Sequence, residues 1–313
     1  MDRDVWVVVL GLGQLTHAVH EGERFDERVE LEGAFESVGD LCPAFGVHGT
    51  SIYDRPAMTL STEKPARASA PNETRRAGPE LLLEVVFRPL ANAFVPLFAR
   101  AGVAPHAVVL ANAAVGLVAA VFLARGELIA AAVLLQVKTL LDNLDGQLAR
   151  ATGRVTLVGR YLDTVADLVV NAAVFTALGY VTGQPFLAAA SFVALTLVLA
   201  VDFNVTELYR HARGIAEPQP PATGGGIERV LTAIYGLVFA PLDHGIRWLG
   251  KHADIDRLTV TVLANLGLST QLLLLGICLA LGAPEVYLGF VLGCLLLVAA
   301  LVGRAERRAR PSL

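Results

Sequence analysis

Four aspartates that could bind metal lie between residues 140 and 170, in the stretch LLDNLDGQLARATGRVTLVGRYLDTVADLVV. Asp142 and Asp145 are three residues apart and Asp163 and Asp167 are four apart, so each pair would lie on one face of a helix. A short turn around ATGRVT would make the two helices antiparallel neighbours, with all four carboxylates facing one pocket. Carboxylates that close repel one another unless a cation compensates for their charge.

A divalent metal ion is the natural compensating charge, because carboxylate oxygens are the ligands that Mg²⁺, Mn²⁺ and Ca²⁺ prefer. Mg²⁺ also tends to share its coordination shell with substrate phosphates. Three small residues, Gly146, Ala149 and Gly159, continue the two acidic faces and would leave room for a flat or bulky ligand beside the metal. The pattern therefore favours a metal site that also binds a phosphorylated ligand.

Basic residues border the four aspartates in the sequence. Their positive charge would suit the binding of anionic groups. These residues are Lys138, Arg150, Arg154 and Arg160. Each feature also has a simpler explanation, since small residues help membrane helices to pack and arginines at span ends act as anchors. Four acids phased onto two adjacent helices are harder to explain in this way, because ionisable residues within membrane segments are usually functional.

The chain after residue 80 is apolar enough to lie in a bilayer. Hydrophobic residues make up 54% of the 313 residues and charged residues only 17%, whereas about a quarter of a typical soluble domain is charged. The three cysteines show no spacing typical of a disulfide framework or a zinc site. Six stretches approach the length of about 20 residues that a span requires. They are residues 106–124, 128–149, 159–181, 186–206, 258–281 and 284–303.

Basic residues are distributed unequally between the connections of these six expected spans. The first, third and fifth connections contain a single arginine, Arg125, and most other basic residues after residue 70 fall on the opposite side. The positive-inside rule then places both termini, and the acidic pocket, at the cytoplasmic face. We therefore expect an all-α integral membrane protein with six transmembrane helices.

Two further stretches are amphipathic and are expected to lie at the membrane surface. Residues 80–103 would form a cytoplasmic entry helix before the first span, at the start of a membrane domain covering residues 80–310. Residues 227–254 are similar, and Pro241 in their short apolar core argues against a seventh span. Residues 1–79 are interpreted as a cytoplasmic segment and linker of unassigned role. Their GLGQLT lacks the third glycine of a dinucleotide-binding loop, and surface positions explain His17 and His20 most simply.

The spacing of the acids and small residues resembles the signature of the CDP-alcohol phosphatidyltransferases. The pattern is Asp142-x2-Asp145-Gly146-x2-Ala149-Arg150-x8-Gly159-x3-Asp163-x3-Asp167, eight fixed residues across 26 positions. The resemblance extends over about residues 80–303. It implies a six-helix membrane enzyme, usually a homodimer, that transfers a phosphatidyl-type group from a CDP-linked lipid donor to an alcohol and releases CMP in phospholipid biosynthesis.

The resemblance also implies roles for the acids. Asp142, Asp145 and Asp163 would hold two divalent ions, Mg²⁺ or Mn²⁺, against the donor diphosphate. Asp167 would complete the metal site or act as the general base that deprotonates the acceptor hydroxyl. An alcohol is a poor nucleophile near neutral pH, so a base within hydrogen-bond reach is required.

The remaining signature residues are implied to contact the nucleotide. Gly146 and Ala149 would lie against the cytidine, Gly159 would give clearance near it, and Arg150 would organise the nucleotide or phosphate region.

The acceptor is less well defined by the sequence. The stretch RPLANAFVPLFARAGVAPHAVVL is loosely similar to the entry segment of family members that use inositol phosphate. Inositol phosphate or glycerol phosphate is therefore preferred over serine, choline or ethanolamine. Arg210 and Arg213, at the end of the fourth expected span, could bind an acceptor phosphate or simply anchor the span.

Two other classes of protein could place acids in a membrane domain. A cation- or proton-coupled transporter would need them near the middle of the membrane, with broken helices in repeated halves. The acids lie instead at the ends of the expected spans, and no internal repeat is visible. A non-catalytic scaffold would not require four acids.

Overall fold

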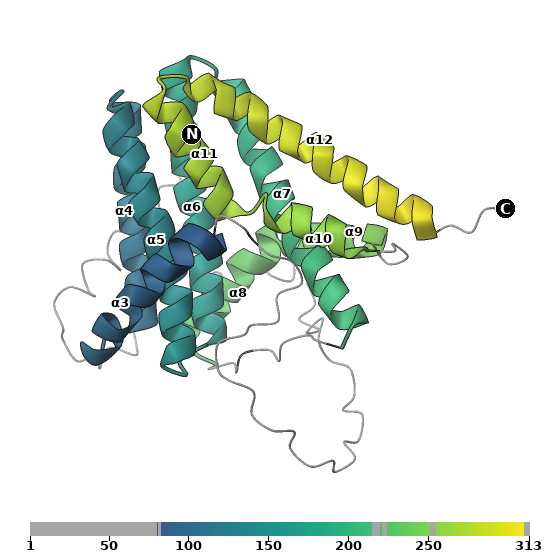
Figure 1. The fold of residues 1–313 in the computed structure, drawn as a ribbon, viewed down its shortest axis with the longest axis horizontal. Helices are drawn as coiled ribbons and strands as arrows, with labels where there is room; N and C mark the ends of the chain where they lie inside the picture. The colour runs from purple at the N-terminus through teal and green to yellow at the C-terminus, as the bar shows by residue number, and fades with distance from the viewer. Residues whose placement is uncertain (1–79, 81–82, 215–219, 221–223, 251–254, 310–313) are drawn as a thin grey trace, which may run out of the picture. The chain divides into compact units, whose positions relative to one another are not determined.

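The computed structural model describes residue 80 and residues 83–214, 220, 224–250 and 255–309 (Figure 1). The chain divides into two units, residues 1–69 and 70–313, and every described residue belongs to the second. Our interpretations of the linker, the GLGQLT stretch and the two histidines before residue 80 lie outside the described residues.

Every element in the described part of the chain is a helix. The elements are η2 (Leu83–Phe87), α3 (Arg88–Arg100), α4 (Pro105–Ala124), α5 (Leu128–Ala151), α6 (Leu157–Thr182), α7 (Pro185–Ala212), α8 (Gly226–Val238), α9 (Ala240–Gly250), α10 (Arg257–Ala264), α11 (Leu268–Ala280) and α12 (Pro284–Ala309). The all-α fold predicted from the sequence is therefore confirmed.

Local sequence signals explain where the long helices begin and end. Pro105 and Pro185 occupy the first positions of α4 and α7, where a missing N–H costs nothing. The Thr156 hydroxyl caps α6 by accepting a hydrogen bond of 3.1 Å from the backbone N–H of Gly159. Gly183 ends α6 with φ of 66°, a left-handed conformation that glycine adopts without strain.

The structure bears out part of the expected membrane topology. Among the described residues, α4, α6, α7 and α12 are long and apolar enough to cross a membrane, and the α10–α11 pair makes five if it is one span. Helix α5 is as long, but Lys138, Asp142 and Asp145 make it more charged than an ordinary span. The expected span over residues 258–281 is not one straight helix, since α10 and α11 meet at a 45° bend.

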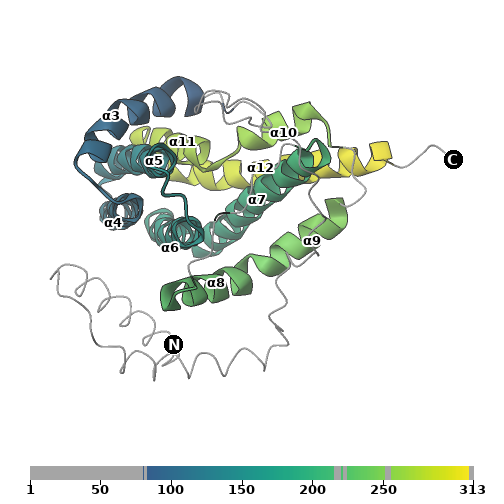
Figure 2. The same cartoon turned by 90° about the horizontal axis from the view of Figure 1, so that it is seen from below.

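Helix α4 fixes the positions of the two helices that carry the aspartates. It packs against both α5 and α6, and Figure 2 shows the three helices nearly end-on. Gly116 permits the close approach to α6, because a Cβ at this position would come within 2.4 Å of Cγ1 of Val170. On the other sides of this group, α11 packs against α5, α7 against α6, and α12 against α7.

The two expected surface stretches fold as shorter helices than predicted. The entry stretch starts with the π-helical η2 and continues as α3, which packs against α5. The second stretch is divided at Phe239 into α8 and α9, which lie end to end along α6 and α7 (Figure 2). Neither α8 nor α9 belongs to the helices long and apolar enough to cross a membrane, as expected for the described part of this stretch.

Candidate active site

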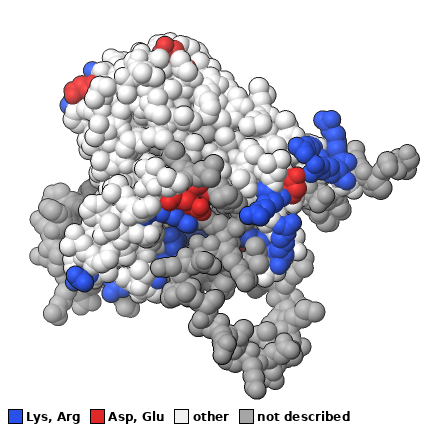
Figure 3. Space-filling model, in the orientation of Figure 1, with Lys and Arg blue, Asp and Glu red and all other residues white. Residues whose placement is uncertain are grey.

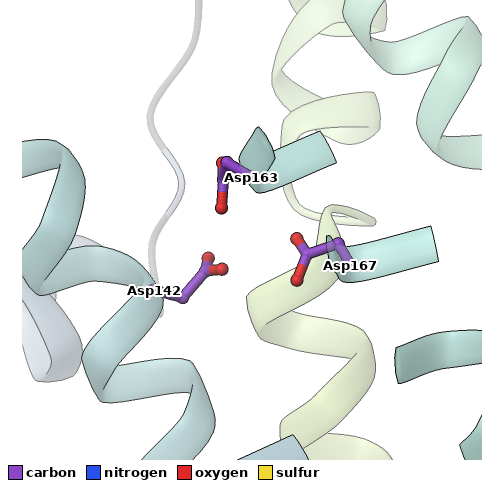
Figure 4. Close-up of side chains that lie close together, drawn as sticks. All are labelled: Asp142, Asp163 and Asp167. Atoms are coloured by element: carbon purple, nitrogen blue, oxygen red, sulfur yellow. The ribbon is translucent and has the colours of Figure 1, made fainter. Parts of the chain in front are cut away.

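The aspartates lie on the two helices that α4 holds in place. Asp142 and Asp145 belong to α5, and Asp163 and Asp167 belong to α6. Figure 4 shows the carboxylates of Asp142, Asp163 and Asp167 pointing toward one another from the two helices. One carboxylate oxygen from each of these three residues lies within 4.8 Å of the other two. We call these three residues the aspartate trio.

Asp145 does not belong to the trio. Its residue is only 6% exposed, and Leu144 and Leu148 on either side of it are fully buried under α3. The expectation of four converging carboxylates is therefore met by three, with the fourth buried beside them. The helical period places Asp145 on the same side of α5 as Asp142, but the depth of its side chain depends on how α3 covers α5.

Two buried nitrogen donors approach the trio from α4 and α5. Asn112 Nδ2 donates a hydrogen bond of 3.0 Å to Asp142 Oδ1. Lys138 Nζ donates to Asp167 Oδ1 at 2.7 Å and lies 3.7 Å from Asp142 Oδ1. Sequence reasoning placed Lys138 near the pocket but missed Asn112. A polar amide in the otherwise apolar stretch of α4 was the available signal.

Oxygen atoms remain free for a ligand on these acids. Asp163 Oδ1 and Asp145 Oδ2 are buried, and neither has a hydrogen-bond partner among the described residues. A buried carboxylate oxygen without a partner is costly, so such atoms usually mark a bound ion or a functional site. The oxygen-only donor set and these open positions fit a divalent cation. Asp142, Asp163 and Asp167 each offer one carboxylate oxygen to such an ion.

The small residues of the signature border this site. Gly146 and Ala149 are half-buried on α5, and the Arg150 guanidinium folds back toward Gly146, 3.5 Å from where a Cβ would be. Gly159 lies in the first turn of α6, where a Cβ would come 3.2 Å from the capping hydroxyl of Thr156. Gly159 thus has a structural reason to be small as well as the expected functional one.

The two arginines proposed for the acceptor lie at the end of α7. Arg210 is half-buried, and its Nε is buried without a hydrogen-bond partner among the described residues. The Arg213 guanidinium lies 3.9 Å above the centre of the Tyr209 ring, a cation–π contact. In the described part of the chain, neither arginine is in direct contact with the aspartate trio.

Charged side chains are concentrated around the site. Figure 3 shows acidic side chains at the centre of this face with basic side chains beside and below them. The upper part of the same view is almost free of charge except at its top and upper left edge. This separation is typical of a membrane protein with its site at one surface.

Comparison with known proteins is consistent with this chemistry. A family model described as CDP-alcohol phosphatidyltransferase matches residues 102–255, which include all four aspartates. A phosphatidylinositol phosphate synthase from Mycobacteroides abscessus is 30% identical over 173 residues, 54% of this chain and 76% of the relative. A protein of the same name from Streptomyces avermitilis is 33% identical over 153 residues, 47% of this chain and 60% of the relative. No solved structure matches the chain.

Proposed function

Because the chain belongs to the CDP-alcohol phosphatidyltransferase family, and is thus a membrane transferase of phospholipid biosynthesis, we propose that it makes a phosphatidylinositol phosphate. The donor is CDP-diacylglycerol, the acceptor is inositol phosphate, and CMP is released. The aspartate trio is the observation that carries this proposal, since its oxygens lie within 4.8 Å of one another. The acceptor is taken from the names of both relatives, and glycerol phosphate is the alternative.

The acids would serve as the metal site of the enzyme. Asp142, Asp145 and Asp163 would hold two divalent ions, Mg²⁺ or Mn²⁺, with Asp167 at the edge of the site. When bound, such ions neutralise the charge of the diphosphate and of the departing CMP phosphate. The free buried oxygens of Asp145 and Asp163 support this assignment.

Asp167 is proposed as the general base. Its Oδ1 accepts a hydrogen bond from Lys138, which fixes the carboxylate and leaves Oδ2 to accept a proton. The acceptor hydroxyl passes its proton to Oδ2, and its oxygen forms a bond to the phosphorus that carries the diacylglycerol. The bond from that phosphorus to the CMP oxygen breaks, and CMP leaves with the bonding electrons.

Binding of the two substrates would use the residues around the trio. Gly146, Ala149 and Gly159 would leave space for the cytidine, and Arg150 would organise the nucleotide phosphates. The buried Nε of Arg210, which has no partner among the described residues, supports a role for this arginine in binding the acceptor phosphate. Arg213 is proposed to assist it.

The membrane arrangement follows from the distribution of charge. We propose six spans, with α5 as the charged one and α10–α11 as a bent one, and with α3 as a cytoplasmic entry helix. Both termini and the site would then face the cytoplasm, where the lipid donor stays in the bilayer and the polar acceptor arrives from water. The protein is proposed to be a homodimer, as its family resemblance implies.

The test is CMP release by the purified protein in nanodiscs that contain CDP-diacylglycerol. Parallel reactions would supply inositol phosphate, glycerol phosphate, free inositol or serine, each with Mg²⁺, Mn²⁺ or EDTA. We expect metal-dependent CMP release that is fastest with inositol phosphate and absent in EDTA. A faster reaction with glycerol phosphate would overturn the proposed acceptor. No metal-dependent CMP release with any acceptor would contradict the proposed reaction and favour the transporter alternative.

A further inference from the structure

Lys138 is a buried cation at the base of the aspartate trio. Its residue is 0% exposed, which is rare for lysine, and it lies on α5 one turn before Asp142. The ammonium is 2.7 Å from Asp167 Oδ1 and 3.7 Å from Asp142 Oδ1. A charge buried to this degree requires compensation, and the two carboxylates provide it.

Helix α4 is shaped to accommodate this lysine. A Cβ at Gly116 would lie 3.2 Å from Lys138 Cδ, so a larger residue there would press on the lysine side chain. Asn112, one turn earlier on α4, donates to the same oxygen of Asp142 that faces the ammonium. The lysine is therefore held by packing on α4 as well as by its ion pairs.

The nitrogen donors reduce the number of oxygen lone pairs that the trio can offer to metal. Oδ1 of Asp142 and Oδ1 of Asp167 each have a lone pair taken up by a nitrogen donor, and Oδ2 of Asp167 is the oxygen proposed to accept the proton. Asp163 Oδ1 has no partner among the described residues. The trio therefore has fewer lone pairs for bridging two adjacent ions than three unengaged carboxylates would have.

The net charge of the site also favours a single bound metal ion. Four ionised aspartates and one ammonium leave a net charge of −3, which one divalent ion reduces to −1. Without substrate, a second divalent ion would make the net charge of the site positive. The buried Lys138 ammonium next to it cannot move out to water. The donor diphosphate brings negative charge and new oxygen ligands, so it would compensate for the second ion.

We propose that the Lys138 ammonium takes the place of one divalent ion in the substrate-free enzyme. The protein then holds one ion until the diphosphate of the donor arrives, and the second ion binds with the diphosphate. This proposal rests on the proposed function and deepens its two-ion assignment. It also makes Lys138 a residue that couples metal binding to donor binding.

The experiment counts Mn²⁺ bound per chain by the purified full-length protein, with and without CDP as the probe. The wild type should bind one ion without CDP and two with it. Lys138→Met, which removes the charge and keeps much of the volume, should bind two ions without CDP. The matched control is Asn112→Ala, which removes a neutral donor from Asp142 and should still bind one. Without CDP, the second ion should bind at least about 100-fold more weakly to the wild type than to Lys138→Met.

Several outcomes would overturn the proposal. Two ions bound by the wild type without CDP would do so, whatever the behaviour of the variant, and so would one ion in a folded Lys138→Met protein. Folding of the variant would be checked by size exclusion and by thermal unfolding in Mn²⁺. CMP release measured on the same wild-type preparation separates the two claims. Active enzyme with two ions in the absence of CDP contradicts this inference alone, and protein that neither binds Mn²⁺ nor releases CMP contradicts the proposed function as well.

Discussion

Within the described part of the chain, two clusters of largely half-buried polar side chains differ in how completely their hydrogen bonds are satisfied. In the cluster between α7, α8 and α9, both oxygens of Asp243 are used: Oδ1 accepts from Asn204 at 2.6 Å and Oδ2 from Tyr235 at 3.0 Å. Asn204 Oδ1 in turn accepts from Arg247 at 2.9 Å. We call these four residues the Asp243 network, and its bonds hold α8 and α9 against α7.

The aspartate trio is only partly satisfied. Asn112 and Lys138 engage one oxygen each on two carboxylates, and Asp163 Oδ1 has no partner among the described residues; the same holds for Oδ2 of the neighbouring Asp145. A saturated network stabilises the fold, whereas one with open positions can bind a ligand. The difference predicts that substitutions in the trio mainly affect chemistry and that substitutions in the Asp243 network mainly affect stability.

The largest expected effect is on catalysis, from Asp167→Asn. The amide cannot accept the proton from the acceptor hydroxyl, so kcat for CMP release should fall by roughly 100- to 10,000-fold. The KM for CDP-diacylglycerol should change much less than kcat, because Asp142, Asp145 and Asp163, which are proposed to hold the ions against the diphosphate, remain. Initial rates over a range of donor concentrations would measure both constants. Near-normal turnover by this variant would rule out Asp167 as the base.

A smaller effect, on stability, is expected from Asp243→Ala. The substitution removes one acceptor of the buried Asn204 amide, which keeps its bond to the Ala200 carbonyl, and the acceptor of the Tyr235 hydroxyl; the free energy of unfolding should fall by about 2 kcal/mol. The midpoint of thermal or denaturant unfolding in detergent would measure the loss. The number of Mn²⁺ ions bound should not change. A variant with normal stability and altered metal binding would reverse the distinction between the two clusters.

The smallest effect is expected at Asp256, a partly exposed acid that precedes α10. Hydrogen bonds from Thr259 and an ion pair of 2.6 Å with Arg308 hold the pKa of Asp256 at about 2, below its usual value of 3.8. Since the folded pKa lies below the unfolded one, this group stabilises the fold above about pH 4, and the contribution is lost as the pH falls toward 2. Asp256→Ala should cost about 1 kcal/mol near neutral pH, measured as a shift in the unfolding midpoint. Asp256→Asn, which retains a capping oxygen, should cost less, and equal losses in the two variants would argue against the cap.

Much of the fold could be predicted because its signals are local. The predicted starts of the spans that became α4, α5, α6, α7 and α12 lie within two residues of the observed starts. The break between α10 and α11 was missed, since Asn265 and Gly267 are weak signals within an apolar run. The number of spans remains a prediction, because the charges of α5 that build the site also make it an unusual transmembrane helix.

The site was predicted in part, for a similar reason. The spacing of the acids and the short turn between the two helices predicted that Asp142, Asp163 and Asp167 would lie together, since the helical period places each pair on one helix face. The separate position of Asp145 depends on α3. The hydrogen bond from Asn112 to Asp142 depends on how α4 packs against α5. Contacts between helices distant in the sequence leave no periodic signal. For the same reason, the packing of the Lys138 side chain against Gly116 of α4 could not be predicted from the sequence.

The most direct measurement compares Asp163→Asn with Asp243→Asn in one preparation series, recording bound Mn²⁺ and Mn²⁺-dependent CMP release for each. Asp163 offers a buried oxygen without a partner among the described residues, whereas Asp243 has both oxygens engaged. The account predicts that Asp163→Asn loses both the metal and CMP release while remaining folded, and that Asp243→Asn retains both. Metal-dependent CMP release at a normal rate from Asp163→Asn would contradict the claim that the aspartate trio is the metal site of this transferase.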